Sequence, residues 1–556
     1  MTGNLPVTPL PRHQDAVDRG LSHLNAGRLA EALQVLGRES RNNRLDVDAQ
    51  LNYGVALYRA RHYEPALEQF ERASRLAPRR WQIYQNIGAV YHGLRRYEEA
   101  YTSTLESVRI NPDNASGLYH LGDMSLIWGE IPEAVDWYRR ALDVDPDHFD
   151  AWIGLLFGLD LLPETTGEQA LAERRAFAHQ FERALGRFKR PHINDRDPDR
   201  KLRIGYISGD FRDHTAAYMF GPIYDHHDRD QFEVYSYADL YFEDTVGEWF
   251  KSASNGWRSI HDVPPQQVDR MIRADQIDIL IDTAGYTSGG KLLQFCAKPA
   301  PIQIQAWGYL TGSGLDAMDA ILVDDVLMPP EHEHHFTEKP LRVPYALGFA
   351  FKDEYAVPIL PRPEGRPLTF GHRGRSDKIS DAAVDLWADV LKAHPGSRMV
   401  MKDRGLEQPR TQARIVQSFT DRGVSEDRLT LLGRTDRVPH LAAYNDVDVI
   451  LDSVPQGGGT TTMEALFMGT PVLTMLGPRI TSRIAGTTLS ALGRSDWIAT
   501  DRDDFIRRAG SLADQGGPHI RDAFTASIVC DGAARTRAFE NAVRNLWRQW
   551  CQRQKE

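Results

Sequence analysis

A period of 34 residues near the N-terminus constrains the fold more than any other feature of this chain. Small residues recur at two phases of this period and proline at a third: Gly20, Gly54, Gly88, Gly122, Ala32, Ala66, Ala100, Ala134, Pro78, Pro112 and Pro146. Small residues where paired helices cross, with proline where each pair ends, are typical of tetratricopeptide repeats. We therefore predict an α-solenoid of about four repeats at residues 14–155, after an N-terminal tail at 1–13.

Polar residues at another phase of the repeat predict what the solenoid binds. Asn52 and Asn86 stand two residues before their repeat glycines, and Asp18 and His120 hold the same phase in the outer repeats. The concave face of a solenoid binds extended chains, and a side-chain amide can hydrogen-bond a peptide backbone whatever its sequence. We predict that Asn52 and Asn86 bind a protein acceptor. The alternative is that they are polar residues on a solvated helix face.

After a charged helix and a proline-rich linker at 156–200, the chain changes to short apolar runs separated by helix-length segments. The runs form two series, one at 203–211, 232–240, 278–285 and 301–307, and one at 368–372, 398–402, 428–433, 447–453 and 471–476. Strands that alternate with helices indicate parallel sheets. The fold class is therefore α plus α/β: the solenoid is followed by two Rossmann-like doubly wound domains, at 201–360 and 361–556, that face each other across a cleft.

The stretch QGGGTTTMEALF at 456–467 predicts an anion site, because it links the strand predicted at 447–453 to a helix. The residues we assign to this site are Gly458, Gly459, Thr460, Thr461 and Thr462. Glycine lets backbone N–H groups approach a ligand, and the first-turn N–H groups of a helix lack intrahelical partners. Glu464, one turn further, could accept hydrogen bonds from ribose hydroxyls. The stretch is neither a Walker A nor a GxGxxG motif, which weakens the NTPase and dehydrogenase hypotheses.

Composition argues against several other classes of protein. No run approaches the ~20 apolar residues of a membrane span, and we expect neither a secretory signal nor a membrane partner. Cys296, Cys530 and Cys551 are too widely spaced for a disulfide framework or a zinc pattern, so a reducing cytoplasm fits best. A net charge of −11 argues against a general nucleic-acid binder.

Motifs along nearly the whole chain resemble those of one known family. After the repeats come RIGYISGDFRDH, DILIDTAGYT, KPAPIQIQAWGY, DKIS and DRVPHLAAYNDVDVILDSVPQGGGTTTMEALFMGTPVLTM, and a closing helix ends in NLWRQW. In this order they resemble the O-linked N-acetylglucosamine transferases and their SPINDLY-type relatives, glycosyltransferase family 41. The resemblance implies a GT-B fold. It also implies an inverting, metal-independent transfer of a sugar, by default from UDP-N-acetylglucosamine, to Ser or Thr of a protein, without a cofactor.

The resemblance also implies roles for single residues. His214 in RDH matches a histidine considered as general base, which suits an imidazole. Lys378 in DKIS matches the lysine that meets the donor phosphates, where a cation neutralises charge on the leaving group. The other matches are Arg437 and His440 in DRVPH around the ribose and phosphate, Thr460 and Thr461 on the phosphates, and Glu464 on the ribose.

Several departures from the family pattern bear on which sugar is transferred. They are GHRGRSD at 371–377, which adds His372, Arg373 and Arg375; GYLTGSG at 308–314, which lacks a proline; Tyr218 in place of a histidine; and Gln456 in place of a tyrosine. Arginine pairs with carboxylates, so cations beside the donor site suggest an acidic sugar. The alternative function is therefore a flagellin glycosyltransferase that uses a CMP-activated nonulosonic acid. A simpler interpretation is that these arginines face solvent.

Two other functions remain open, an inactive protein-binding scaffold and a glycosyltransferase for small molecules or glycans. The intact Lys378 and His440 argue against the first, and a peptide-binding solenoid would be superfluous for the second. The segment 329–340 holds His332, His334 and His335, which could bind zinc. Because zinc ligands normally come from a rigid geometry and this is a proline-bounded loop, we predict no metal site.

Overall fold

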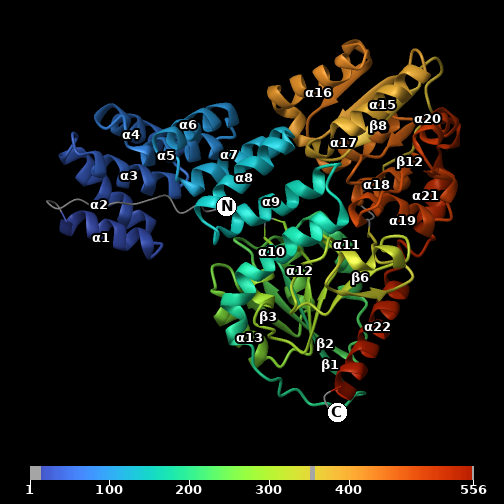
Figure 1. Cartoon of the computed structure of the whole chain (residues 1–556), viewed down its shortest axis with the longest axis horizontal. Coiled ribbons are helices and arrows are strands. Elements are labelled where there is room, and N and C mark those ends of the chain that lie inside the picture. The colour runs from blue at the N-terminus through green and yellow to red at the C-terminus, as the bar shows by residue number, and fades with distance from the viewer. Residues whose placement is uncertain (1–13, 288, 351–356, 554–556) are drawn as a thin grey trace. The chain divides into compact units, whose positions relative to one another are not determined.

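The computed structural model describes residues 14–287, 289–350 and 357–553, so the tail predicted at 1–13 lies outside the described residues. The chain divides into two compact units (Figure 1). One is helical and runs to residue 155, and the other comprises residues 156–556 together with 127–131. Within the described ranges, no helix is both long enough and apolar enough to cross a bilayer.

Antiparallel helix pairs make up the first unit, as the repeat predicts. In order they are α1 (Gln14–Asn25), α2 (Leu29–Asn42), α3 (Val47–Arg59), α4 (Tyr63–Leu76), α5 (Trp81–Gly93), α6 (Tyr97–Ile110), α7 (Ala115–Trp128), α8 (Ile131–Val144) and α9 (Phe149–Leu161). A Cβ on Gly54 would collide with Phe70, and one on Gly122 with Tyr138, because each glycine faces the partner helix of its pair. The predicted solenoid is confirmed, and its small residues allow the helices to approach closely.

The second unit begins with α10 (Gly167–Leu185), the turn η1 (Gly186–Phe188) and a sheet of seven strands. The strands are β1 (Leu202–Ser208), β2 (Phe232–Ala238), β3 (Gly256–Ser259), β4 (Ile279–Asp282), β5 (Ile302–Gln305), β6 (Ala320–Val323) and β7 (Lys339–Arg342). They are parallel, in the order β3-β2-β1-β4-β5-β6-β7. The connections contain α11 (Thr215–Asp225), α12 (Thr245–Ala253), α13 (Pro265–Ala274), α14 (Leu292–Phe295) and η2 (Pro330–His335).

A second parallel sheet of six strands follows, in the order β10-β9-β8-β11-β12-β13. Its strands are β8 (Thr369–Arg373), β9 (Arg398–Lys402), β10 (Leu429–Leu432), β11 (Val449–Leu451), β12 (Val472–Met475) and β13 (Ile498–Ala499). The helices are α15 (Asp381–Ala393), α16 (Pro409–Asp421), α17 (Arg437–Ala442), α18 (Thr460–Phe467), α19 (Ile484–Ala491), α20 (Arg502–Ser511), α21 (Pro518–Thr525) and α22 (Gly532–Arg553), with short turns η4 (Ser376–Lys378), η5 (Arg404–Glu407) and η7 (Ala443–Asp446). Two doubly wound halves are thus confirmed, and the short strands β3, β6, β7 and β13 are additions that the sequence pattern did not predict.

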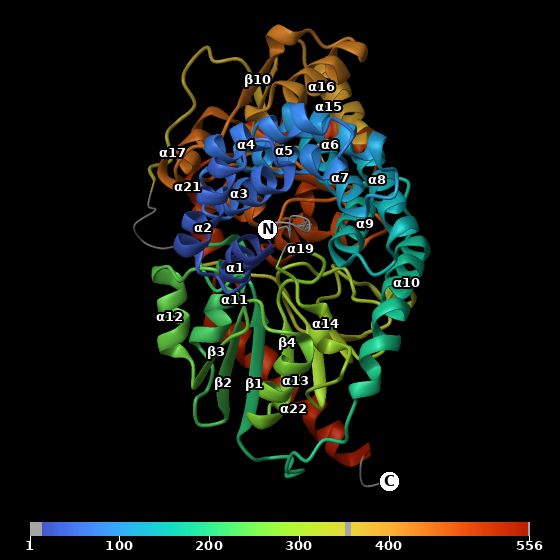
Figure 2. The ribbon, with the colours of Figure 1, turned by 90° about the vertical axis from the view of Figure 1, so that its left-hand side faces the viewer.

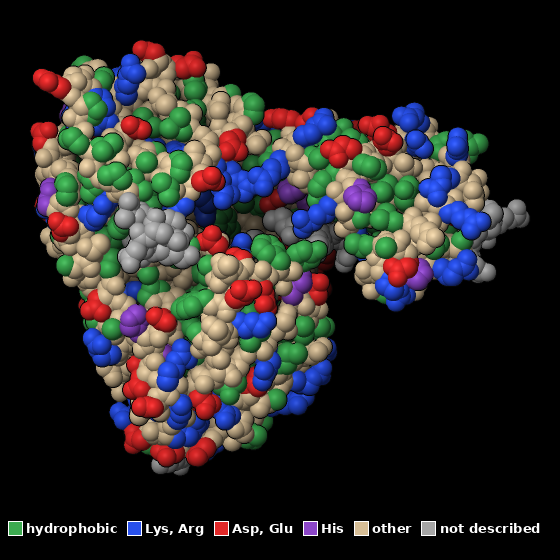
Figure 3. All heavy atoms as spheres, turned by 180° about the vertical axis from the view of Figure 1, so that it is seen from behind, with side chains coloured by type: hydrophobic (Ala, Val, Ile, Leu, Met, Phe, Trp, Pro, Cys, Tyr) green, Lys and Arg blue, Asp and Glu red, His purple; other side chains and the backbone are tan. Residues whose placement is uncertain are grey.

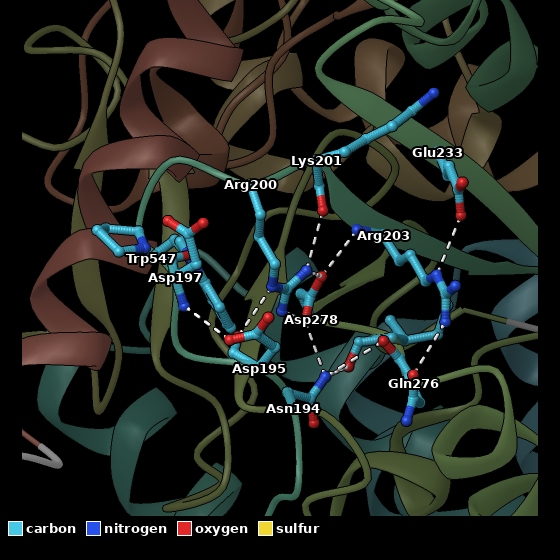
Figure 4. A network of polar contacts seen from close by, with 12 residues as sticks. Asn194, Asp195, Asp197, Arg200, Lys201, Arg203, Glu233, Gln276, Asp278 and Trp547 are labelled. Atoms are coloured by element: carbon cyan, nitrogen blue, oxygen red, sulfur yellow. Dashed lines mark hydrogen bonds and ion pairs between the residues drawn. The ribbon is translucent and has the colours of Figure 1, made fainter.

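The last helix, α22, returns to the first α/β half. Glu540 accepts hydrogen bonds from the backbone N–H of Asp228 and contacts His227, both at 2.9 Å. The indole of Trp547 donates to the carbonyl of Asp197 in the segment before β1, as Figure 4 shows. The closing helix therefore belongs to the second half in sequence and to the first half in packing.

The linker before β1 is fixed by one buried carboxylate, that of Asp278 (Figure 4). This carboxylate accepts hydrogen bonds from Asn194 at 2.8 Å, from both terminal nitrogens of Arg200 and from the N–H of Arg203. A buried carboxylate needs such charged or polar partners to remain ionised. Elsewhere on the molecule, acidic and basic side chains are interspersed on the face that Figure 3 presents.

Candidate active site

The glycine loop after β11 has a fixed shape because Asp452 holds it. The buried carboxylate of Asp452 accepts hydrogen bonds from the N–H of Gly458 and the hydroxyl of Thr474, both at 2.7 Å. The hydroxyl of Thr462 donates to the carbonyl of Gly458 at 2.9 Å. A Cβ on Gly458 would lie 2.7 Å from the hydroxyl of Thr461, so this position requires glycine. Gly458 and Thr462 are both predicted to bind the donor. The N–H of Gly458 and the hydroxyl of Thr462 form hydrogen bonds within the loop itself.

The first turn of α18 is open to a ligand. The helix begins at Thr460, and the N–H groups of Gly459, Thr460 and Thr461 have no acceptor among the described residues. Thr460 and Thr461 are partly exposed, and α18 has no side-chain cap. Unpaired N–H groups and the positive end of a helix dipole form an anion site. The structure thus has free donors where the sequence predicts phosphate binding.

Lys378 places a cation at the same loop. Its ammonium group, carried by η4 between β8 and α15, donates to the carbonyl of Gly457 at 2.9 Å. Burial, reinforced by the charge of Arg375, lowers the pKa of Lys378 to about 8, although Asp377 and Asp452 oppose the shift. At neutral pH the group is still mostly protonated. It has two N–H donors left for a ligand beside the anion site.

Glu464 is the centre of a buried network. One carboxylate oxygen accepts a hydrogen bond from Arg437, and the other contacts His440 at 3.0 Å and Tyr444 at 3.1 Å. Burial raises the pKa of Glu464, but the hydrogen bond with His440 and the charge of Arg437 outweigh it and hold the pKa below its ordinary value. The charged carboxylate thereby fixes Arg437 and His440. Its capacity to bind a ribose as well is reduced to one remaining lone pair.

Tyr444 is a site residue that sequence reasoning missed. Its hydroxyl, which has a single proton to donate, lies 3.1 Å from Glu464 and 3.2 Å from the carbonyl of Thr461, so it links the Glu464 network to the first turn of α18. The residue follows His440 by four positions along α17 and η7. That spacing puts both side chains on one side of a helical segment, which is the signal that could have identified it.

His214 caps the helix that follows β1. It is the N-cap of α11, and its Nδ1 lies 3.1 Å from Asp210 and 3.3 Å from the N–H of Ala216. Burial lowers the pKa of His214, with Asp210 opposing, so the imidazole is neutral at neutral pH. A neutral imidazole can take a proton, as a general base must.

Two of the three added cations in the segment 371–377 do not face a ligand. His372 is buried against Trp387, with ring centroids 4.8 Å apart, and burial lowers its pKa to about 3. Arg373 is buried as well and donates to the carbonyl of Ala443 at 2.9 Å. The prediction of three cations at the donor site was therefore wrong for these two. The residues alternate along β8, and both faces of this central strand are covered by the fold.

Arg375 is the member of this segment that stays accessible, with 46% of its side chain exposed. Its guanidinium donates to the side chain of Gln456 at 3.2 Å and lies over the ring of Phe157, 4.7 Å from the centroid. Tyr309 packs on the same ring at 5.4 Å and donates to Asp160 at 2.9 Å. We call Arg375, Gln456, Tyr309 and Phe157 the Arg375 cluster. The first three come from three different segments that depart from the family pattern. Only the fold shows that these departures meet.

The two solenoid asparagines are buried and poorly satisfied. Asn52 on α3 and Asn86 on α5 expose 1% and 0% of their surface. These two helices lie side by side (Figure 2). Among the residues that the structure describes, the amide nitrogens of both asparagines, and the amide oxygen of Asn86, have no hydrogen-bond partner. The alternative that they lie on a solvated face is therefore wrong. A buried amide without a partner costs about 1–3 kcal/mol, which a ligand that hydrogen-bonds it recovers.

Comparisons with known proteins agree with this architecture. The model of Glycosyl transferase family 41 matches residues 171–350 and 369–521, and a tetratricopeptide repeat model matches 17–80, 56–115 and 93–149. A solved structure of a mutant O-GlcNAc transferase from Thermobaculum terrenum superposes with a TM-score of 0.83 at 28% identity, covering 91% of this chain and 98% of that one.

Curated relatives cover a smaller share. Probable UDP-N-acetylglucosamine–peptide N-acetylglucosaminyltransferases named SPINDLY from Oryza sativa subsp. japonica and Arabidopsis thaliana are each 28% identical, over 74% and 73% of this chain. A UDP-N-acetylglucosamine–peptide N-acetylglucosaminyltransferase from Caenorhabditis elegans is 23% identical over 63% of the chain. The chain spans about half the length of these curated relatives, 46% of each SPINDLY protein and 41% of the nematode protein.

Proposed function

Because the chain belongs to glycosyltransferase family 41, we propose that it transfers a sugar from a nucleotide sugar to Ser or Thr of a protein. UDP-N-acetylglucosamine is the donor we propose first, since the SPINDLY relatives and the nematode relative are named for it. One observation carries the proposal: the unpaired first turn of α18 lies next to a lysine whose ammonium group is 2.9 Å from the glycine loop. The reaction is proposed for the cytoplasm, in line with three cysteines that form no disulfide.

In the proposed reaction the acceptor hydroxyl oxygen attacks the anomeric carbon while the bond to the donor phosphate breaks. The electron pair leaves with the nucleoside phosphate, whose charge is stabilised by Lys378 and the N–H groups of Thr460 and Thr461. The hydroxyl proton passes to the imidazole of His214. A single displacement inverts the anomeric carbon. Lys378 supplies the positive charge in this scheme, and therefore no metal ion is included.

The acceptor protein is proposed to lie along the solenoid. Asn52 and Asn86 have buried amide groups without partners, and an extended backbone would supply both a donor and an acceptor. Such contacts do not select side chains, so sequence selection must come from the α/β unit. A peptide-binding solenoid of this kind favours a protein acceptor over a small molecule.

A second donor is favoured by Arg375. Its side chain is 46% exposed close to Gln456 of the glycine loop. Its Nε pairs with Asp377 at 3.1 Å, so the terminal nitrogens are the donors that a sugar carboxylate would meet. An acidic sugar carried by CMP, such as a nonulosonic acid transferred to flagellin, is the donor class that this arrangement fits. Of the three added cations, Arg375 is the accessible one, so this alternative depends on that arginine alone.

Calorimetric titration of the purified protein with UDP, GDP and CMP tests the proposal and separates the donors. Selective binding of UDP supports N-acetylglucosamine, and selective binding of CMP supports the acidic sugar. In the second case Arg375→Ala is expected to abolish turnover of the acidic donor while CMP still binds. Lys378→Ala should weaken nucleotide binding, and Lys392→Ala, on the exposed face of α15, serves as the control. Binding of none of the three nucleotides would leave a protein-binding scaffold.

A further inference from the structure

The first turn of α10 and the turn η2 bring together three side chains that a metal ion can bind. They are Glu168, His334 and His335, whose ligand atoms all lie within 4.8 Å of one another. The carboxylate of Glu168 is 3.4 Å from Nε2 of His335 and 3.9 Å from Nε2 of His334. In the described part of the chain, three such groups reach this spacing only here.

The chemistry of these three groups favours zinc over magnesium or calcium. Zinc bonds to imidazole nitrogen and carboxylate oxygen are about 2.0–2.2 Å long, which puts tetrahedral ligands about 3.3–3.6 Å apart. The His335–Glu168 distance of 3.4 Å already fits this value, and the exposed His334 can rotate the remaining distance. Mg²⁺ and Ca²⁺ prefer oxygen ligands throughout. We propose that Glu168, His334 and His335 form a Zn²⁺ site, with water at the fourth position.

The local backbone supplies the rigidity that the sequence analysis did not expect. The histidines do not lie in an irregular loop, because residues 330–335 form the 3₁₀ turn η2. Arg342 of β7 holds this turn by donating to the carbonyl of Met328 at 2.8 Å and to Glu333. The ring of His335 packs directly on the backbone of Gly167, where a Cβ would collide with it. The sequence could not show Glu168 as the third ligand, because it lies more than 160 residues away.

A bound ion would support residues 308–314 of the first α/β half through Phe336 and Glu338, which follow η2. Phe336 packs on Gly312, where any Cβ would lie 2.8 Å from its ring, and Glu338 accepts a hydrogen bond from the N–H of Ser313 at 2.6 Å. Both contacts support the segment 308–314, which carries Tyr309 of the Arg375 cluster. The ion would therefore fasten α10 and η2 on one side of this segment. This role is separate from the proposed sugar transfer, in which Glu168, His334 and His335 take no part.

Zinc titration of the full-length, tag-free protein after dialysis against a chelator tests the site. Wild type is expected to bind one equivalent of Zn²⁺ and to unfold at a higher temperature when it is bound. His335→Ala and the nearly isosteric Glu168→Gln should each weaken binding by about tenfold or more and remove the temperature shift. His519→Ala, which removes an exposed histidine on α21, should change neither.

Several outcomes would overturn the site. Wild type that binds no zinc would do so, as would unchanged zinc binding in both ligand variants. Equal binding of Mg²⁺ and Zn²⁺ would overturn the assignment of the ion. Glu168→Gln guards against misfolding of the alanine variant, because its side chain is largely exposed and keeps its shape.

Discussion

Two buried polar side chains, one in the solenoid and one in the second α/β half, differ in how many hydrogen-bond partners they have. Asn86 is fully buried and its amide has no partner, whereas the buried carboxylate of Glu464 contacts Arg437, His440 and Tyr444. A satisfied network fixes the positions of its members before a ligand arrives. An unsatisfied amide, by contrast, keeps its hydrogen bonds for a ligand. The comparison teaches that the proposed donor site is held in place by charged partners, whereas the solenoid asparagines that we propose for the acceptor keep unsatisfied amide groups.

The largest effect is expected from breaking the satisfied network. Glu464→Ala leaves Arg437 and His440 without their anion, and removing one partner of a buried ion pair costs about 3–5 kcal/mol. The free energy of unfolding, measured by urea titration, should fall by that amount and nucleotide binding should be lost. A loss no larger than that of an exposed carboxylate, such as Glu407→Ala, would contradict the proposed role of the network.

The same network predicts a pH dependence. The pKa of Glu464 lies below its ordinary value of 4.5, so its ionised form stabilises the fold at pH values above 4.5. As the pH falls through the lowered pKa, this contribution is lost. The difference in unfolding free energy between wild type and Glu464→Gln should therefore be largest above pH 4.5 and shrink towards lower pH. A difference that grows on acidification would refute this assignment.

Lys378 lies between the two extremes, because one of its three donors has a partner among the described residues. If the other two meet the leaving group, Lys378→Ala should lower kcat by about 10²–10³-fold, as does removal of a single donor that stabilises transition-state charge. Steady-state turnover, with Lys392→Ala as the control, measures this. The unfolding free energy should change far less than in Glu464→Ala, and a large loss of stability would mean that Lys378 is mainly structural.

Two solenoid asparagines offer a matched pair within one unit. Asn114 donates to Gln85 at 2.5 Å and accepts from the N–H of Gly117 at 3.1 Å, whereas Asn86 has no partner. Asn114→Ala should destabilise the protein by about 1–3 kcal/mol because it leaves buried groups unpaired, and Asn86→Ala should destabilise it by less. Asn86→Ala should instead raise KM for the acceptor protein and leave donor binding unchanged. Equal losses of stability in both variants would remove the distinction.

The smallest effect concerns the acid limb of the rate profile. Burial lowers the pKa of His214 below its ordinary 6.5, and Asp210 opposes this shift. If His214 is the base, kcat/KM should rise with pH through a value below 6.5 and then level off. Asp210→Asn should move that limb to still lower pH, because it removes the charge that favours the protonated imidazole. A limb that moves upward would exclude this pairing.

Local patterns in the sequence were sufficient for the elements of the fold. The 34-residue period predicted the solenoid, and the alternation of apolar runs predicted both parallel sheets, because spacing along a chain reports directly on helices and strands. The glycine loop with its helix start at Thr460 also followed from local backbone chemistry. The short strands β3, β6, β7 and β13 escaped prediction because two to four residues carry no clear period.

Side-chain orientation could not be derived in the same way. His372, Arg373 and Arg375 look alike as a run of cations, but the strand sends the first two into the interior and leaves the third accessible. Burial then makes His372 neutral, a property set by neighbours such as Trp387 that lie close only in the folded chain.

By itself, the sequence determined the solenoid and the two doubly wound halves, and it predicted the glycine loop and helix start that we propose for the donor phosphates. Only the tertiary structure decided that Asn86 is buried without a partner, that Arg375 meets Gln456 and Phe157, and that Glu168 joins two histidines. The physical reason is range. Propensity, periodicity and turn chemistry act over a few neighbouring residues, whereas hydrogen bonding, desolvation and ligand geometry depend on groups that the fold brings together from distant segments.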